Sequence, residues 1–100
     1  MKAKLLLKQH HVLSEKAFLE MIVWQVPHPV SGSEHSFKYR LALVVEQHCV
    51  LRYDNESGKG DHKHIGNNEV DYKFTTTQQL IEDFMTDVKL WRIKHEHSND

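Results

Sequence analysis

The strongest constraint on the fold is a strict alternation of side-chain type along residues 37–46. Every second side chain is large and apolar, while most intervening ones are charged or small. A period of two is typical of a β-strand with one buried face. Residues 49–54 alternate in the same way. The two stretches predict an antiparallel hairpin whose apolar face carries Phe37, Tyr39, Leu41, Leu43, Cys49, Leu51 and Tyr53.

The connection between these two strands decides which residues face each other. A three-residue turn at residues 46–48 would place Val45 opposite Cys49 and Arg40 opposite Asp54. A two-residue turn would mix charged and apolar residues on both faces, so the pattern favours the longer turn. We therefore expect one charged face, formed by Lys38, Arg40, Arg52 and Asp54.

Further strands are expected on both sides of this hairpin. Residues 15–26 are long enough for a helix, which stays an alternative for their first half, but residues 22–26 are β-branched and aromatic and favour a strand. Residues 27–36 contain two prolines and form a long loop, a type of segment that is often functional. His10 and His11 are placed in a polar turn. The additional predicted strands are residues 3–7, 15–26, 61–65 and 70–74, the last at a sheet edge.

The clearest helical pattern covers residues 77–94. Apolar residues recur there at helical spacing, and Thr75 or Thr76 stands three residues before a glutamine, as in a capping box. The predicted fold is α+β, an antiparallel sheet of about five strands with one long C-terminal helix packed across one face. We expect a single domain over residues 1–100, with its core at 3–94 and a flexible tail at 95–100.

Composition limits the classes of function. The net charge is −1, so any nucleic-acid site must be a local patch. The lone Cys49 excludes an internal disulfide and a multi-cysteine zinc site, and its apolar neighbours predict burial. No signal peptide or membrane span is visible, so we expect a cytoplasmic protein without membrane contact. The histidines assigned to ordinary exposed surface are His10, His11, His28, His48, His95 and His97.

Reactive residue types concentrate in residues 52–66. Two glycines flank a lysine, an arrangement that can present backbone N–H groups and an ammonium to an anion. His62 and His64 follow, and imidazoles transfer protons near neutral pH. We favour a phosphate-handling site over a solvated hairpin loop. The phosphate-binding candidates are Gly58, Lys59, Gly60 and Lys38.

Two segments, residues 32–41 and 51–64, resemble the core of the TumE-type toxins of prokaryotic toxin–antitoxin modules. The second segment contains Arg-Tyr-Asp-Asn and then Gly-Lys-Gly-Asp-His, and the similarity extends from Lys4 to Trp91. The resemblance implies a toxin whose cognate partner is a small DNA-binding antitoxin, often of winged-helix type. It leaves the reaction and a homo-oligomeric state open. Small toxins of this kind commonly act on RNA, which is an argument by analogy.

The residues fit metal-free RNA cleavage. That reaction needs a base for the ribose 2′-OH, an acid for the leaving oxygen and cations for the phosphate. The acid–base candidates are His62, His64 and His35, and the cations are Lys59, Arg40 and Arg52. Asp54 or Asp61 would orient a histidine or hold an arginine.

Two alternatives use the same residues. His62 and His64 point the same way from a strand, and Asp54, Asp61 or His35 could complete a metal site. The neighbouring Lys59 and Lys63 repel a cation, so we expect no metal and no cofactor. The other alternative is a non-catalytic module whose basic loop binds nucleic acid or an acidic protein. The arginines could also be plain cross-strand ion-pair partners of Asp54 or Glu56.

Overall fold

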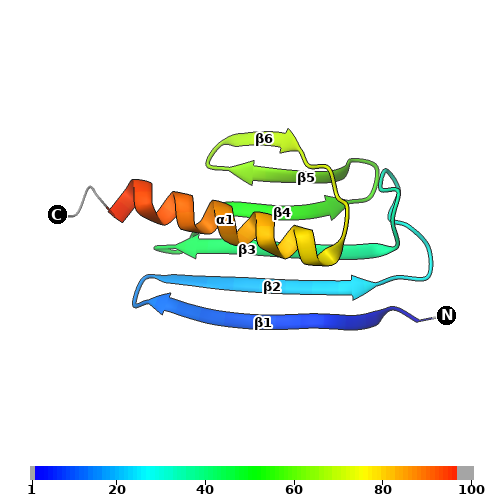
Figure 1. The fold of residues 1–100 in the computed structure, drawn as a ribbon, viewed down its shortest axis with the longest axis horizontal. Helices are drawn as coiled ribbons and strands as arrows, with labels where there is room; N and C mark the ends of the chain where they lie inside the picture. Colours follow the sequence, from blue (N-terminus) through cyan, green and yellow to red (C-terminus); the bar gives the residue numbers. More distant parts are fainter. Residues whose placement is uncertain (1, 97–100) are drawn as a thin grey trace.

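The computed structural model describes residues 2–96, which form one antiparallel sheet and one helix (Figure 1). The six strands follow one another across the sheet in chain order, so each pairs with its neighbours in sequence. The helix α1 lies across one face of the sheet, over β3 and β4. The strands are β1 Lys4–Ser14, β2 Ala17–Gln25, β3 Phe37–Val45, β4 His48–Glu56, β5 Gly60–Ile65 and β6 Asn68–Asp71, and α1 is Thr77–Glu96.

This architecture confirms the predicted α+β class, with six strands in place of about five. β1 continues to Ser14, so placing His10 and His11 in a turn was wrong. Most of this edge strand is exposed on both faces, and its sequence therefore lacks a clear alternation. β2 is a strand throughout, which excludes the helical alternative for the first half of residues 15–26. β6 lies at residues 68–71 and not at 70–74.

The helix begins at the predicted residue and continues two residues further than expected. The Thr76 hydroxyl oxygen accepts a hydrogen bond from the Gln79 N–H at 3.0 Å and so caps the first turn. Residues 95 and 96 are helical, and the rest of the predicted tail, 97–100, lies outside the described residues. No helix within residues 2–96 is long and apolar enough to cross a membrane.

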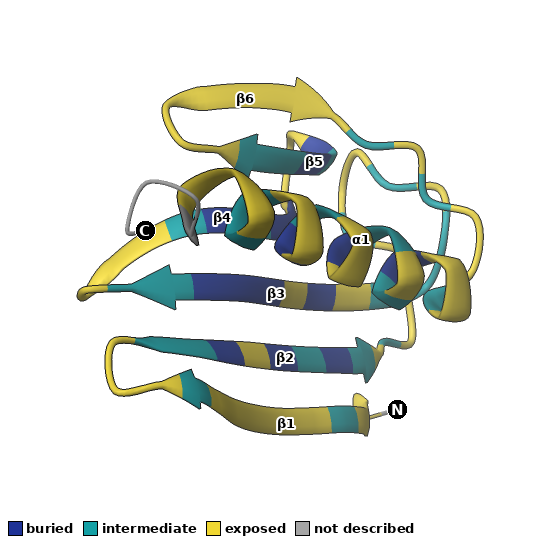
Figure 2. Cartoon of the chain, turned by 60° about the vertical axis from the view of Figure 1, so that its left-hand side comes forward, coloured by how far each residue is buried: buried dark blue, intermediate teal, exposed yellow. Residues whose placement is uncertain are grey.

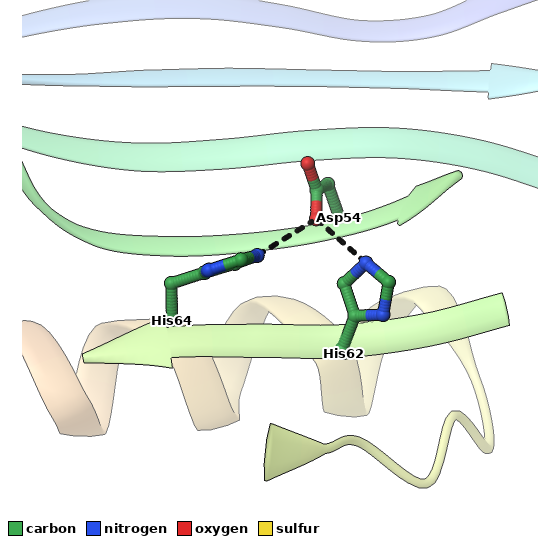
Figure 3. A group of neighbouring side chains, drawn as sticks. All are labelled: Asp54, His62 and His64. Atoms are coloured by element: carbon green, nitrogen blue, oxygen red, sulfur yellow. Dashed lines mark ion pairs between the residues drawn. The ribbon is translucent and has the colours of Figure 1, made fainter. Parts of the chain in front are cut away.

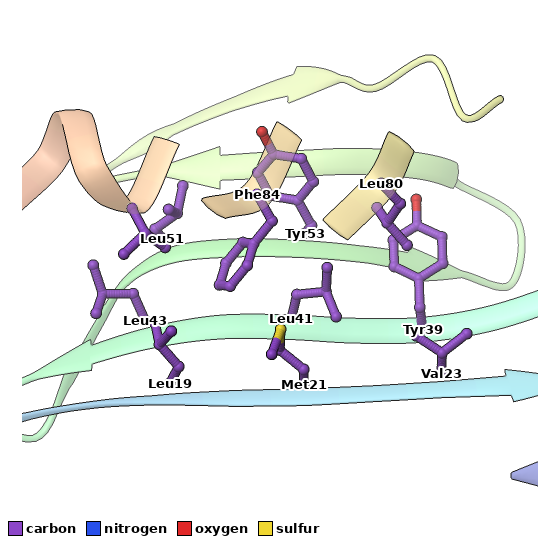
Figure 4. Close-up of a cluster of buried hydrophobic side chains, with 11 residues drawn as sticks. Leu19, Met21, Val23, Tyr39, Leu41, Leu43, Leu51, Tyr53, Leu80 and Phe84 are labelled. Atoms are coloured by element: carbon purple, nitrogen blue, oxygen red, sulfur yellow. The ribbon is translucent and has the colours of Figure 1, made fainter. Parts of the chain in front are cut away.

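The core lies between α1 and the face of the sheet that the helix covers (Figure 2). Leu80, Phe84 and Val88 of α1 pack against this face. Burial of one such side chain stabilises a fold by about 1.5–3 kcal/mol, so this contact is a main source of stability. The sheet residues of the core are Leu19, Met21, Val23, Tyr39, Leu41, Leu43, Leu51 and Tyr53 (Figure 4).

The β3–β4 turn differs from the prediction, yet the register further along the hairpin is the predicted one. The turn has two residues, Glu46 and Gln47, with φ of 50° and 71°. Turns with two positive φ angles match the twist of paired strands. A bulge then adds one residue to β4, so that Arg40 faces Asp54 as expected. The bulge restores the separation of apolar and charged faces that a two-residue turn alone would remove.

We call the face of the sheet away from α1 the open face, because no other helix is present within residues 2–96. Arg40, Arg52 and Asp54 lie on it, between positions that point toward the buried core, and this confirms the predicted charged face. The predicted burial of Cys49 is wrong, since this residue is exposed. It lies on the turn side of the bulge and pairs with Val44, which moves it to the open face.

Candidate functional site

Two adjacent rows of cross-strand neighbours run over the open face, with one residue from each strand. Neighbours in such rows have Cβ atoms about 4.5–5.5 Å apart, so their side chains interact. The rows are richest in charged and imidazole groups between β3 and β6. The first row is Lys8, Ile22, Arg40, Asp54, His62 and Asp71, and the second is His10, Glu20, Ala42, Arg52, His64 and Glu69.

Asp54 lies at the centre of the charged part of these rows (Figure 3). Its Oδ2 atom is 3.1 Å from Arg52 Nε. Its Oδ1 atom is 3.6 Å from His62 Nε2 and 3.9 Å from His64 Nε2. The β4–β5 register produces this arrangement, because Asp54 pairs with His62 and Arg52 pairs with His64. We call these four residues the Asp54 cluster.

The contacts of His64 indicate which of its ring nitrogens carries the proton, and Glu69 lies near both imidazoles. Arg52 Nη2 is 2.9 Å from His64 Nε2. Because a guanidinium only donates, His64 accepts this bond on Nε2 and carries its proton on Nδ1. Glu69 faces the Nδ1 atoms of both rings, at 3.7 Å from His62 and 3.8 Å from His64. Glu69 therefore borders the Asp54 cluster on the side opposite Asp54.

Within residues 2–96, three buried atoms of the Asp54 cluster lack a hydrogen bond of good geometry, namely Arg52 Nε, Asp54 Oδ1 and His62 Nε2. Their polar contacts are the ion pairs of 3.1 and 3.6 Å given above. Asp54 is 7% exposed and His62 is 3% exposed. Buried polar groups in proteins are nearly always paired, and each exception asks for a physical explanation. Unused bonding capacity at the centre of the cluster is what a ligand-binding site requires before its ligand arrives.

The members of the cluster differ in their exposure to solvent. The side chains of His64 and Arg52 are 25% and 29% exposed, whereas that of His62 is 4% exposed. Arg40, beside Asp54 in the neighbouring strand, is about half exposed, and its ion pair within residues 2–96 is a long one, of 3.9 Å to Glu20. An anion that approaches this face meets the two guanidinium groups and His64 first, with His62 and Asp54 beneath them.

A second polar cluster lies on the other face of the sheet, beside the helix. Asp61 accepts hydrogen bonds from Ser33 Oγ at 2.5 Å, from His35 Nε2 at 2.6 Å and from Tyr39 OH at 2.7 Å. The Phe37 N–H donates to His35 Nδ1 at 3.2 Å, so both ring nitrogens of His35 are used. We call Ser33, His35, Tyr39 and Asp61 the Asp61 cluster.

The Asp61 cluster is also fixed by packing. The His35 ring stacks on Phe74 with 3.7 Å between ring centroids. Burial, and then the hydrogen bond to Asp61, raises the pKa of Tyr39 far above its ordinary value of 10.0. Each group is paired or stacked, and the bonds join the loop before β3 to β3 and β5. This arrangement stabilises the fold and leaves its histidine with no free nitrogen.

The glycines around Lys59 serve a contact between two loops. The Gly58 N–H donates to Ser31 O at 2.8 Å, and the Lys59 N–H donates to Glu56 O at 3.1 Å. Gly60 has a φ of +75°, and a Cβ atom there would lie 2.5 Å from Gly32 O. Two of the N–H groups that could have bound an anion are therefore bonded within the protein. The side chain of Lys59 is exposed and keeps that role.

The structure thus divides the residues singled out from the sequence. It brings Arg40, Arg52, Asp54, His62 and His64 together on the open face, with Lys38 two residues along β3. It places His35, Asp61 and Lys59 together around a separate depression that Phe74 also lines.

Sequence reasoning missed Glu69. β5 and β6 are joined by two residues, Gly66 and Asn67, and Gly66 has a φ of +60°. A glycine at such a position is a signal for a tight hairpin. With that turn, Ile65 faces Asn68, and the next pair away from the turn is His64 opposite Glu69, as in the structure.

The protein is a small α+β protein, with six sequential strands in one sheet and one helix on one face of that sheet. The other face presents a polar cluster of arginine, aspartate and histidine side chains. The chain belongs to the toxin TumE family, whose family model matches residues 2–92. It is therefore a toxin of a toxin–antitoxin module, and an antitoxin is its partner. Searches of curated proteins and of solved structures found no match.

Proposed function

We propose that this toxin is a ribonuclease that cleaves RNA on its open face without a metal ion, through the Asp54 cluster. The observation that carries the proposal is the pair of imidazoles around the buried Asp54 carboxylate, with the Arg52 guanidinium bonded to His64 and Arg40 opposite Asp54 in the neighbouring strand. Phosphodiester cleavage by the neighbouring 2′-OH needs proton transfer and stabilisation of negative charge, and this cluster contains both kinds of group.

Arg52 and Arg40 are the phosphate-binding groups in this mechanism. Both guanidiniums lie on the solvent side of the cluster, and an arginine can bind two phosphate oxygens at once. When Arg52 turns toward the phosphate, it leaves His64 Nε2, which frees the lone pair of that ring.

His64 is then the base that takes the 2′-OH proton, and His62 is the acid that protonates the leaving 5′ oxygen. The 2′ oxygen bonds to phosphorus as the bond to the 5′ oxygen breaks, which yields a 2′,3′-cyclic phosphate and a free 5′-hydroxyl. Asp54 holds Arg52 and faces both rings within 4 Å. Lys38 and Lys59 lie outside the cluster, so we assign them to RNA backbone contacts away from the reacting phosphate, and His35 and Asp61 to the fold.

The direct test is cleavage of a defined RNA by the purified chain in excess chelator, followed by mapping of new 5′ ends. His64→Gln and His62→Gln should each lower the rate about 10²–10⁴-fold, as expected for loss of a proton-transfer group. His10→Gln is the matched control, because His10 lies on the open face at the far end of the same row as His64.

The outcomes separate catalysis from binding. If both glutamine variants cleave RNA at the wild-type rate, the acid–base roles are wrong. If the variants still bind RNA and remain toxic while Arg40→Gln and Arg52→Gln do not, the open face is a binding surface and not a catalytic one.

The partner and setting follow from the same proposal. A toxin that acts on RNA would work in the cytoplasm, and the family resemblance implies a small DNA-binding antitoxin, often of winged-helix type. Co-expression with the adjacent gene should restore growth and yield a stable complex. A neighbouring gene product that neither binds the toxin nor restores growth would contradict this assignment.

A further inference from the structure

We propose that Asp54, His62 and His64 form a binding site for one divalent transition-metal ion of the zinc class, and that Glu69 orients the two imidazoles. This proposal concerns ion binding and stands independently of the ribonuclease proposal. It reverses the expectation, drawn from the sequence, that the chain binds no metal.

The positions of the ligand atoms support an ion site. One ligand atom from each of the three residues lies within 4.8 Å of the other two. Ligands about 2.0–2.2 Å from a tetrahedral ion lie roughly 3.3–3.6 Å from one another. The distance of 3.6 Å between His62 Nε2 and Asp54 Oδ1 already fits, and the 3.9 Å between His64 Nε2 and Asp54 Oδ1 needs only a small side-chain shift.

The bonding state of these atoms points to the same ligand. Asp54 Oδ1 and His62 Nε2 belong to residues more than nine-tenths buried, face each other at 3.6 Å and have no hydrogen-bond partner within residues 2–96. A metal ion between them would bond to both atoms at once. Two imidazole nitrogens and one carboxylate oxygen suit zinc, nickel or copper, and they suit magnesium or calcium poorly.

Glu69 is placed to accept the second N–H of each imidazole when the other ring nitrogen binds a metal. Imidazoles that bind a metal through one nitrogen usually donate the other N–H to a carboxylate or carbonyl, which sets the ring orientation. The Glu69 carboxylate faces Nδ1 of His62 at 3.7 Å and Nδ1 of His64 at 3.8 Å. Both rings therefore direct Nε2 toward Asp54 and Nδ1 toward Glu69, as two ligands of one ion would.

The lysines that argued against a cation are not close to the cluster. Lys63 lies on the helix side of the sheet, where its ammonium bonds Asp87 at 3.2 Å. Lys59 lies at the β4–β5 turn and lines the depression beside His35. Alternation along β5 separates Lys63 from the two histidines, which adjacency in the sequence does not reveal.

Arg52 is the cation that contacts the proposed ligand atoms. Its Nη2 atom is 2.9 Å from His64 Nε2, where the ion would bind. Because the Arg52 side chain is partly exposed, it can turn toward solvent and leave His64 free. Loss of the guanidinium should therefore increase the affinity for metal, which distinguishes this site from histidines on an ordinary surface.

The test is calorimetric titration of Zn²⁺ into the full chain, without a histidine tag and after removal of metal by a chelator. We expect one equivalent to bind. Asp54→Asn and His62→Gln should abolish this binding, and Glu69→Gln should weaken it about 10–100-fold. Arg52→Gln should bind more tightly than the wild type.

Two controls identify the site. Asp71→Asn removes an exposed carboxylate that pairs with His62 in the sheet but makes no ion pair with it, and should change nothing. The double variant His10→Gln/His11→Gln removes neighbouring exposed imidazoles and should keep the same stoichiometry and affinity.

The proposal is overturned if the wild type binds no Zn²⁺, or if folded Asp54→Asn and His62→Gln bind it as the wild type does. Circular dichroism of each variant establishes that it is folded. Absorption of the Co²⁺ complex provides a second measurement, since a loaded tetrahedral site has a visible spectrum that the Asp54→Asn variant should lack. RNA cleavage is measured in chelator, so its failure and the failure of metal binding are separate results.

Discussion

The Asp54 cluster and the Asp61 cluster contain the same residue types but differ in whether their bonds are complete. Each has an aspartate in contact with at least one histidine, on opposite faces of one sheet. In the Asp61 cluster the carboxylate accepts three hydrogen bonds, and His35 uses both ring nitrogens. In the Asp54 cluster three buried atoms make ion pairs but no hydrogen bond of good geometry within residues 2–96. Complete bonding is typical of a structural cluster, whereas the incomplete one has capacity left for a ligand.

The clusters also differ in how they are assembled. The Asp61 cluster joins the loop before β3 to β3 and β5, and Phe74 stacks on it. Its removal should therefore loosen several segments. The Asp54 cluster sits on adjacent strands, where main-chain pairing already sets the positions. Substitutions of its side chains should therefore affect the fold less than substitutions in the Asp61 cluster, and this difference can be measured.

The largest expected difference is in RNA cleavage. His64→Gln should reduce the rate about 10²–10⁴-fold with an almost unchanged melting temperature. His35→Gln should show the reverse pattern, a lower melting temperature with the wild-type rate per folded molecule. Single-turnover kinetics and thermal unfolding on the same samples measure both. A slow but stable His35→Gln variant would break the division between the two clusters.

Stability should respond in the opposite order. Asp61→Ala leaves three donors without an acceptor in a largely buried site, which should lower the free energy of unfolding by about 3 kcal/mol. Asp54→Asn should cost less, about 1–2 kcal/mol, because the carboxamide keeps the shape of the side chain and the main loss is one ion pair, to the partly exposed Arg52. Urea denaturation measures both values, and equal losses for the two variants would contradict the comparison.

Saturating Zn²⁺ should inhibit RNA cleavage by the wild-type toxin, because metal binding and proton transfer use the same Nε2 atoms. If Arg52→Gln still cleaves RNA, Zn²⁺ should inhibit that variant as well. Zn²⁺ that raises the rate above that in chelator would assign the chemistry to the metal and not to the histidines.

High pH provides a smaller effect that acts through the helix-side face. Burial, followed by hydrogen bonds to aspartates, raises the pKa values of Tyr39, Tyr53 and Tyr72 above their ordinary 10.0. The folded state then holds these protons more tightly than the unfolded state. Stability is full below about pH 10 and falls as pH rises further, by up to about 1.4 kcal/mol per pH unit for a fully buried tyrosine.

Tyrosinate absorbance and urea unfolding test this directly between about pH 9 and 12, a range that brackets the ordinary tyrosine pKa of about 10. We expect little tyrosinate absorbance until the protein unfolds. Ordinary titration of all three tyrosines near pH 10 in the folded protein would show that their aspartate contacts are absent.

The smallest predicted effect comes from Ser33→Ala. This change removes one of the three donors to Asp61 and leaves His35 and Tyr39 in place. It should lower the free energy of unfolding by about 1 kcal/mol, with no change in RNA cleavage. A much larger loss would mean that Ser33 also holds the loop through Asn55, whose amide lies 3.3 Å from its oxygen.

The central hairpin and the helix were predictable because their side chains repeat with clear periods. Arg40 was placed opposite Asp54 correctly, although the turn was shorter and a bulge made up the difference. Neither Glu46 nor Gln47 is a residue that signals a turn with positive φ. Local pattern therefore gave the right faces, and it gave the wrong turn and the wrong environment for Cys49.

The composition of the site was less predictable, for two physical reasons. Asp61, His62 and Lys63 are adjacent in sequence, but alternation along β5 sends His62 to the opposite face from its two neighbours. A strict use of the two-residue period would have separated them. The position of His35 depends on the contact between Gly32 and Gly60, which brings two distant loops together and has no signal in either segment alone.

The strands lie in the sheet in the same order as in the sequence, and this has a consequence for synthesis of the toxin. Each strand can pair with the one made just before it, so none must wait for a distant partner. The residues of the Asp54 cluster are all present once residue 64 has been added, yet the apolar face stays uncovered until α1 follows. A chain interrupted before residue 77 would expose Leu41, Leu43 and Leu51 and should aggregate. Incomplete translation products of this toxin should therefore be lost as insoluble protein, without an antitoxin to restrain them.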